Sequence, residues 1–238
     1  MKLQQVMSRV RKAVDDYKMI EEGDKIAIGI SGGKDSLTLL YALNGLKRFY
    51  PKHFDIIAIS VDLGFKNVSF DKIKALCDDL GVDYHVINTD ISQIVFDDRK
   101  ESNPCSLCAK MRKGALNDLA KSLNCNKIAY AHHEDDVVET YIMSLIYEGR
   151  MHTFRPVTYL DRMDLTVIRP LVYMKEADVI GFVNKENVPV LKSPCPVDGY
   201  TKREYVKNLI KDINNDAPGV KERIFTALQS SDLDGWGL

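Results

Sequence analysis

Strand-forming and helix-forming segments alternate through the first 150 residues, and this alternation constrains the fold most. Segments rich in apolar residues predict strands at 24–30, 55–61, 82–87 and 127–131. Apolar residues at helical spacing follow each of them and predict helices at 36–47, 68–80, 108–123 and 135–147. Strands that are apolar on both faces are typical of a covered parallel sheet. The pattern therefore predicts an α/β fold, a doubly wound parallel sheet that binds ligands beyond the carboxyl ends of its strands.

The pattern changes after Gly149. Two short apolar segments, 157–160 and 165–168, flank a polar turn and predict a hairpin. Further helices are expected at 175–187, after a capping box at 201–204, and at 218–229 with Pro218 in the first turn. The expected division is an N-terminal helix (1–22), an α/β domain (23–150) and a C-terminal hairpin and helical region (151–238).

The composition is that of a folded globular protein. Of the 238 residues 45% are hydrophobic and 28% are charged, which excludes a disordered tail or a collagen-like repeat. No apolar run approaches the roughly 18 to 20 residues of a membrane span, and the N-terminus has no signal core. We therefore expect a cytoplasmic protein without a membrane partner. Five cysteines form an odd set, which argues against a disulfide framework and leaves thiol or metal chemistry open.

The net charge of −1 conceals an uneven distribution. Residues 62–98 carry a net −5, whereas residues 150–175 and 192–211 each carry +3. A basic C-terminal half suits a protein with one side facing a polyanion. A solvated surface of mixed charge is the alternative, and on charge alone it is the commoner explanation.

A glycine-rich loop, Ser-Gly-Gly-Lys-Asp-Ser at residues 31–36, lies between the first strand and its helix. Its glycines let a ligand approach the backbone, and the N–H groups at the helix start attract anions. It is not a Walker loop, because Asp35 follows Lys34 where Ser or Thr is required. A carboxylate here would repel phosphate unless a divalent cation lay between them, so Asp35 predicts Mg²⁺. The structural alternative is a tight turn capped by Ser36.

This loop resembles the pyrophosphate loop of the N-type ATP pyrophosphatases, and all six positions match. The resemblance implies an adenine nucleotide alpha hydrolase-like (PP-loop) fold that adenylates an oxygen of its substrate with ATP. A second motif, at residues 131–140, also resembles the family and follows the fourth strand. An acidic helix start favoured by the helix dipole explains its aspartates equally well. The residues implied to bind ATP are Ser31, Gly32, Gly33, Lys34, Asp35, Ser36 and His132, with Asp35, Asp135 and Lys34 in catalysis.

The cysteines divide into two groups. Cys105 and Cys108 have the two-residue gap that places both sulfurs on one metal or cluster, but a zinc ribbon would need a second such pair. Cys195 lies between two prolines, where a core cysteine is unexpected. Cys77 falls among apolar helix residues and is interpreted as a packed thiol. Cys125 is a candidate fourth ligand.

With the loop, Cys105, Cys108 and Cys195 resemble the tRNA 2-thiocytidine synthetase family over residues 24–214. The resemblance implies a [4Fe–4S] cluster on three cysteines, with the fourth iron open to a hydrosulfide. It also implies that ATP adenylates C2 of a cytidine, usually at position 32 of tRNA, before sulfur from a cysteine desulfurase or sulfide replaces AMP. The sequence departs from better-known members at 196–199, where Pro-Val-Asp-Gly replaces Gly-Ser-Gln after the third cysteine.

Basic residues near these motifs predict the tRNA-facing side, although a single arginine is more often a surface ion pair. The predicted RNA contacts are Arg112, Arg155, Arg169, Lys202 and Arg203. A second copy of the chain is a further candidate partner. Two other functions remain open. One is an adenylating amidation enzyme of the lysidine synthetase type with a structural cysteine or zinc site. The other is an iron–sulfur sensor that binds ATP and RNA without catalysis.

Overall fold

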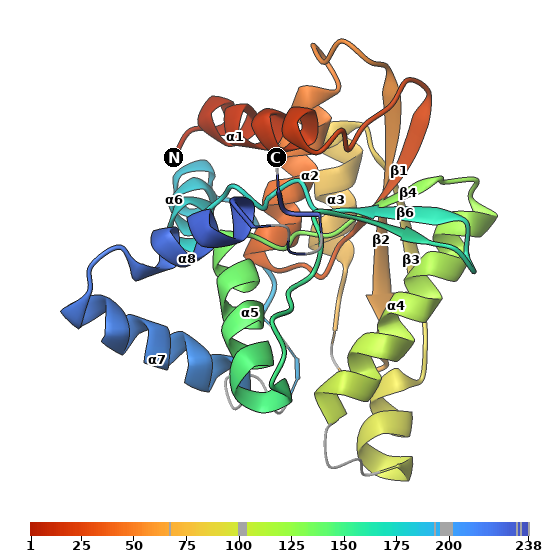
Figure 1. The fold of residues 1–238 in the computed structure, drawn as a ribbon. Helices are drawn as coiled ribbons and strands as arrows, with labels where there is room; N and C mark the ends of the chain where they lie inside the picture. Colours follow the sequence, from red (N-terminus) through yellow and green to blue (C-terminus); the bar gives the residue numbers. More distant parts are fainter. Residues whose placement is uncertain are drawn as a thin grey trace.

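The computed structural model describes residues 1–66, 68–99, 104–192, 194–195, 202–231, 233 and 235–237. These residues build a six-stranded sheet with the order β3-β2-β1-β4-β6-β5 (Figure 1). The parallel strands are β1 (Asp24–Gly29), β2 (Phe54–Asp62), β3 (Asp83–Asn88), β4 (Lys127–Ala129) and β6 (Leu165–Ile168). The edge strand β5 (Val157–Leu160) runs antiparallel to β6. The expected doubly wound α/β fold is therefore confirmed.

Helices cover both faces of the sheet. The helices of the described residues are α1 (Leu3–Asp16), α2 (Lys34–Leu46), α3 (Asp71–Leu80), the π-helix η1 (Gln93–Asp98), α4 (Pro104–Ser122), α5 (Glu134–Glu148), α6 (Glu176–Glu186), α7 (Lys202–Asp216) and α8 (Val220–Gln229). Alternate residues of β1 enter different cores, because neighbouring strand residues face opposite sides. Ile26 and Ile28 pack with α1, α2 and α6, whereas Ala27 packs with Leu116 and Ala120 of α4.

Several element boundaries differ from the sequence prediction. The N-terminal helix, expected over 1–22, covers only Leu3–Asp16, and α3 begins at Asp71 rather than residue 68. Helix α4 begins at Pro104 rather than residue 108, since proline is well suited to a first helical turn. Strand β4 ends at Ala129 rather than residue 131. Pro218 lies before α8 rather than in its first turn, because the N-cap Gly219 has a φ of 82° that a helix cannot include. The predicted capping box begins at Thr201, which lies outside the described residues.

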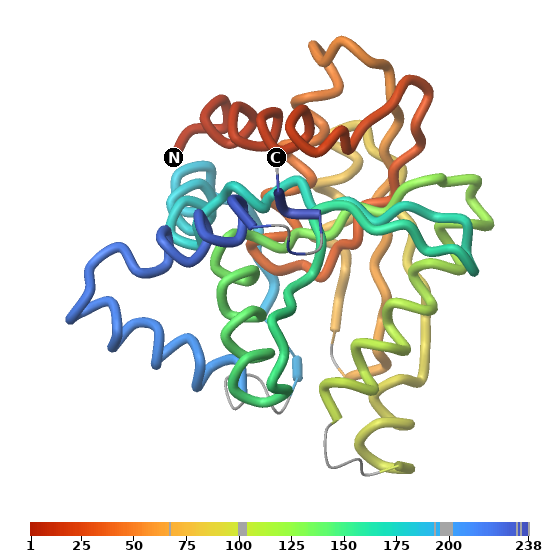
Figure 2. The backbone as a smooth tube through the Cα atoms, viewed as in Figure 1, coloured from red at the N-terminus to blue at the C-terminus, as the bar shows by residue number. Residues whose placement is uncertain are grey.

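The C-terminal part of the chain packs onto the α/β layers. Strand β6 pairs with β4, so the predicted hairpin extends the main sheet, and the domain division at residue 150 stays a prediction. Helices α7 and α8 pack against α5. Figure 2 shows the chain end returning toward the N-terminal helix. There Trp236 is fully buried, contacts Tyr17 and donates a hydrogen bond to the Phe154 carbonyl at 3.0 Å.

Candidate active site

Three chain segments meet where β1, β4 and β6 end. The register pairs Ile28 of β1 with Ala129 of β4, and Ala129 with Ile168 of β6. The segments that follow, 31–36, 132–136 and Arg169, therefore start side by side at the carboxyl edge of the sheet (Figure 1). This is the edge at which doubly wound folds bind ligands.

The loop at residues 31–36 is held by its own serines. The Ser36 hydroxyl donates to the Gly33 carbonyl at 2.9 Å and accepts the Ser31 N–H at 3.2 Å. Gly33 is the N-cap of α2, so no side chain caps the first N–H groups of the helix. Such N–H groups, facing the loop, suit a phosphate. The loop thus combines a fixed turn with an open set of donors.

Gly32 is the position in this loop that tolerates substitution least. Its φ is 78°, and an added Cβ would lie 2.8 Å from Leu191 Cδ1. We expect Gly32→Ala to destabilise the fold by about 2 to 4 kcal/mol and to weaken ATP binding. Gly23→Ala is the matched control, because Gly23 has a φ of 80° and open space around it. Denaturant unfolding and ATP titration of both variants measure the effect, and equal losses would contradict a role for the Leu191 contact.

Lys34 and Asp35 form the charged part of the loop. Lys34 Nζ lies 3.0 Å from Asp35 Oδ2 and 3.2 Å from Glu176 Oε1. Burial lowers the pKa of Lys34, but these two carboxylates outweigh it, so the pKa is raised and the cation is kept. The other carboxylate oxygen, Asp35 Oδ1, is buried without a hydrogen-bond partner and lies 3.6 Å from His133 Nε2.

The unpartnered Asp35 oxygen fits a divalent cation. Mg²⁺ usually takes one or two carboxylates together with phosphate oxygens and water, and it does not need a protein cage. The described residues contain no group of three His, Cys, Asp or Glu side chains arranged to hold a metal ion. A single aspartate beside a phosphate loop meets the requirement for magnesium bound with a nucleotide.

Two consecutive histidines face different sides of the site. His133 is the N-cap of α5, where its Nδ1 accepts the Asp136 N–H at 3.3 Å and its Nε2 faces Asp35. Its backbone is extended, so neighbouring side chains diverge. His132 instead accepts a hydrogen bond from Arg169 Nε at 3.3 Å. Burial and the charge of Arg169 hold the pKa of His132 far below its usual value, so His132 stays neutral.

Asp135 is held by two donors at the start of α5. Its Oδ2 accepts the Glu176 N–H at 2.7 Å, and its Oδ1 accepts from Lys221 Nζ at 2.5 Å. Burial raises the pKa of Asp135, but these hydrogen bonds outweigh burial and the pKa is lowered. Lys207 Nζ lies 2.7 Å from Glu176, which also contacts Lys34. Helices α7 and α8 thus bring cations to the edge that carries the phosphate loop.

The sequence prediction missed Glu176, Lys207 and Lys221. Arg203 and Lys207 are four residues apart on α7, so their shared face was available as a signal. Arg203 uses this face to contact Glu139 at 3.1 Å. No signal could have found Lys221, because its partner Asp135 is 86 residues away in the sequence.

The Lys221–Asp135 pair predicts a pH-dependent contribution to stability. A carboxyl whose pKa is lowered in the folded state stabilises the fold above its unfolded pKa, and this is lost as the pH falls through the folded pKa. We expect Lys221→Met to lose about 1 to 3 kcal/mol at pH 7 and progressively less below about pH 4. Urea unfolding across pH measures this. Lys175→Met, which removes a more exposed pair with Glu222, should cost less than about 1 kcal/mol; an equal loss would contradict the prediction.

Three of the five cysteines are neighbours. Cys105 and Cys108 lie one turn apart at the start of α4, and Cys195 follows α6. The pKa of Cys108 is raised, first by burial and also by the charges of Cys195 and Cys105, while Arg112 opposes the rise. The three thiols therefore lie within electrostatic reach of one another, and none of them forms a disulfide. Thiolates are the ligands of iron–sulfur clusters, so the chemistry of these three side chains fits such a group, although they do not form a ready three-ligand arrangement.

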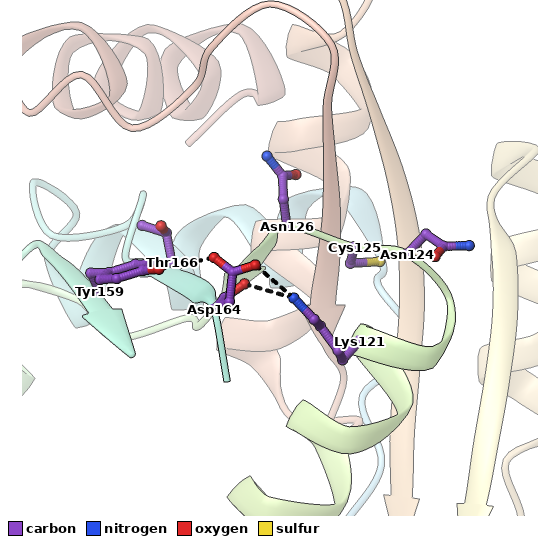
Figure 3. Close-up of a pocket in the computed structure, with 7 residues that line it drawn as sticks. All are labelled: Lys121, Asn124, Cys125, Asn126, Tyr159, Asp164 and Thr166. Carbon is purple, nitrogen blue, oxygen red and sulfur yellow. Dashed lines mark hydrogen bonds and ion pairs between the residues drawn. The ribbon is translucent and has the colours of Figure 1, made fainter. Parts of the chain in front are cut away.

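The other two cysteines lie away from this group. Cys77 is buried in the larger core, as predicted, and burial raises its pKa to about 11. Cys125 is buried beyond the far end of α4, beside a polar pocket of about 380 Å³ (Figure 3). The length of α4 separates it from Cys105, so the suggestion that Cys125 is a fourth ligand is wrong. Within that pocket Lys121 and Tyr159 bind Asp164, at 3.0 and 2.9 Å.

The predicted RNA contacts occupy different environments. Arg112, Arg155 and Lys202 are exposed, whereas Arg203 is half-buried in its contacts with α5. Lys202 Nζ lies 4.7 Å from the centre of the Tyr147 ring. Arg169 is only 7% exposed. Contact of these residues with tRNA stays a prediction.

The fold and the phosphate loop define a nucleotide-binding PP-loop protein, and comparisons with known proteins agree. The sequence profile described as PP-loop domain matches residues 2–213. A tRNA-cytidine(32) 2-sulfurtransferase of Geobacter sulfurreducens is 37% identical over 94% of this chain and 88% of that protein. A tRNA-cytidine(32) 2-sulfurtransferase of Geotalea uraniireducens is 39% identical over 94% of this chain and 90% of that protein. The chain therefore belongs to the PP-loop family, and within it to the tRNA-cytidine(32) 2-sulfurtransferases, which confirms the resemblance seen in the sequence.

Solved structures place the fold in the same group. The U34-tRNA thiolase NcsA of Methanococcus maripaludis, with its [4Fe-4S] cluster, has a TM-score of 0.75 and 26% identity over 93% of this chain and 75% of that chain. An NH3-dependent NAD synthetase of Campylobacter jejuni shares the fold. Its TM-score is 0.54 and its identity 15%, over 93% of this chain and 88% of that chain. No helix among the described residues is long and apolar enough to cross a membrane.

Proposed function

We propose that this protein is an ATP-dependent transferase that converts a cytidine of tRNA, at position 32, into 2-thiocytidine. The observation that carries the proposal is a PP-loop protein with three cysteines within electrostatic reach of one another, whose relatives bear this activity in their names. The 4Fe-4S tRNA thiolase of similar fold supports an iron–sulfur cluster on Cys105, Cys108 and Cys195. Sulfur would come from a cysteine desulfurase or from sulfide.

The loop residues carry the first half of the reaction. ATP lies with its phosphates on the N–H groups and hydroxyls of residues 31–36, and Lys34 offsets their charge. Asp35 Oδ1 would hold Mg²⁺, whose charge would offset the negative charge of the departing pyrophosphate. The cytidine C2 oxygen attacks the α-phosphorus as the bond to the β-phosphate breaks. Asp135, fixed by Lys221 and the Glu176 N–H, keeps the start of α5 in place beside the reacting phosphate.

The cysteines serve the second half of the reaction, the transfer of sulfur. Cys105, Cys108 and Cys195 would hold the cluster. A bound [4Fe–4S] cluster would supply a hydrosulfide to displace AMP from C2. Because the target base lies inside a folded tRNA, it has to be turned out toward this edge.

A reconstituted reaction tests the proposal. Anaerobically purified protein is given tRNA, ATP and sulfide, and iron, pyrophosphate and 2-thiocytidine are measured. We expect all three, with pyrophosphate release dependent on tRNA. An iron-free protein that requires an amino acid would point instead to the amidation reaction. Cluster and nucleotide binding without pyrophosphate would indicate a sensor.

A further inference from the structure

Arg169 is a buried cation without an acidic partner. Its guanidinium donates to the Arg155 carbonyl at 2.6 Å, to Thr158 Oγ1 at 3.3 Å and to His132 Nδ1 at 3.3 Å, and all three acceptors are neutral. Among the described residues no carboxylate lies within ion-pair distance of it. Buried charges in proteins are normally paired, because removal from water is costly. Burial lowers the pKa of Arg169 to about 10, so the guanidinium still carries its charge at neutral pH.

The surroundings of Arg169 add positive charge. Burial lowers the pKa of Lys113, and the nearby charges of Arg169 and Arg112 lower it further. His132 remains neutral and so adds no negative charge. The acid whose charge acts on His132 is Asp136, which is already bound by the His133 N–H and lies 3.5 Å from Arg203. A site of this kind is electrostatically incomplete without an anion.

The geometry around Arg169 suits an oxyanion. The Arg169 guanidinium lies over the Phe154 ring, with Cζ 4.9 Å from the ring centre. Nη2 makes no hydrogen bond to any described residue, so one edge of the fork remains open. A planar fork matches phosphate better than a single-centre anion such as hydrosulfide.

Arg169 lies at the same edge of the sheet as the phosphate loop. Arg169 follows β6, the loop follows β1, and β4 lies between them. His132 contacts Arg169, while the adjacent His133 faces Asp35 of the loop. The two histidines therefore connect the phosphate loop to the Arg169 guanidinium, a further cation at the carboxyl edge of the sheet. When the two terminal phosphates of ATP occupy the loop, the next phosphate along the nucleotide is the α-phosphate, and Arg169 is a cation on the same edge.

We propose that Arg169 is the binding point for the α-phosphate of ATP and retains that phosphate while it is transferred. This proposal deepens the proposed function and rests on it for the transfer step. In that step the bond from the cytidine C2 oxygen to the α-phosphorus forms, and the bond to the bridging oxygen breaks with its electron pair leaving on pyrophosphate. Arg169 holds the non-bridging oxygens throughout, so it binds the AMP portion and not the departing pyrophosphate.

Separate titrations with AMP and with pyrophosphate test the proposal on the full chain. We expect Arg169→Gln to weaken AMP binding about 10- to 100-fold and to change pyrophosphate binding less than about twofold. Arg169→Lys should weaken AMP binding less, since it keeps the charge and loses the fork. Arg162→Gln is the matched control, because Arg162 is an exposed arginine of the same hairpin.

Several outcomes would overturn this proposal. Equal weakening of AMP and pyrophosphate would assign Arg169 a structural role in holding the hairpin. Unchanged AMP binding with weaker tRNA binding would make Arg169 an RNA contact. Wild-type protein that binds pyrophosphate but not AMP would leave no α-phosphate site. The AMP and pyrophosphate titrations need no tRNA, so their result is separate from the proposed function: selective loss of AMP binding in Arg169→Gln would stand even if no 2-thiocytidine were formed.

Discussion

Replacing Asp35 by Asn is expected to reduce tRNA-dependent pyrophosphate release by on the order of a thousandfold. Asp35 Oδ1 is buried beside the phosphate loop without a hydrogen-bond partner, so its charge is available to a cation. The amide keeps the shape of the side chain and removes that charge. Steady-state pyrophosphate assays at several Mg²⁺ concentrations measure the loss.

The same variant should keep its iron content, because Asp35 and the cysteines lie on different elements. Asp164→Asn is the control, since Asp164 is an exposed aspartate paired with Lys121. It should change turnover less than about twofold. Pyrophosphate release within threefold of wild type in Asp35→Asn would show that Asp35 does not hold the catalytic cation.

Replacing Cys195 by Ala is expected to remove nearly all cluster iron and acid-labile sulfide, and with them thiolation. Two thiolates from the first turn of α4 cannot hold a [4Fe–4S] cluster stably without the third ligand. ATP binding should be unchanged, because the loop at residues 31–36 does not use the cysteines. Iron and sulfide assays on anaerobically purified protein, followed by ATP titration, measure both effects.

Cys125→Ala is the matched control for this experiment. Cys125 is buried beyond the far end of α4, so its loss should leave the iron content unchanged. If Cys195→Ala retained full iron and full thiolation, the assignment of three cysteine ligands would be wrong. If only Cys125→Ala lost iron, the cluster would have to be sought elsewhere.

Local patterns predicted the sheet and the loop well. The strands β1 and β2 are apolar along most of their length, so burial on both faces could be predicted from the sequence alone. The loop could be predicted because its two glycines and its serines act on neighbouring backbone atoms. In both cases the interactions that decide the structure join residues close in sequence or repeat with a short period.

Long-range charge pairing could not be predicted in this way. The basic C-terminal segments indicated a polyanion-facing surface, yet two of their cations bind acids within the protein. Arg203 contacts Glu139 and Lys207 contacts Glu176, and beyond these segments Lys221 contacts Asp135. Conversely, the sequence predicts Arg169 as an RNA contact, and only the fold shows that it is buried with no carboxylate among the described residues as its partner. Net charge along a sequence does not reveal which charges neutralise one another.

Mass spectrometry of nucleosides in total tRNA, from cells with and without this gene, tests the central claim most directly. We expect 2-thiocytidine to disappear without the gene, to return with the wild-type gene, and to stay absent with the Asp35→Asn or Cys195→Ala variant. Other thiolated nucleosides should be unchanged. An unchanged level of 2-thiocytidine in cells that lack the gene would contradict the proposed substrate, and the nucleoside lost in its place would identify the true one.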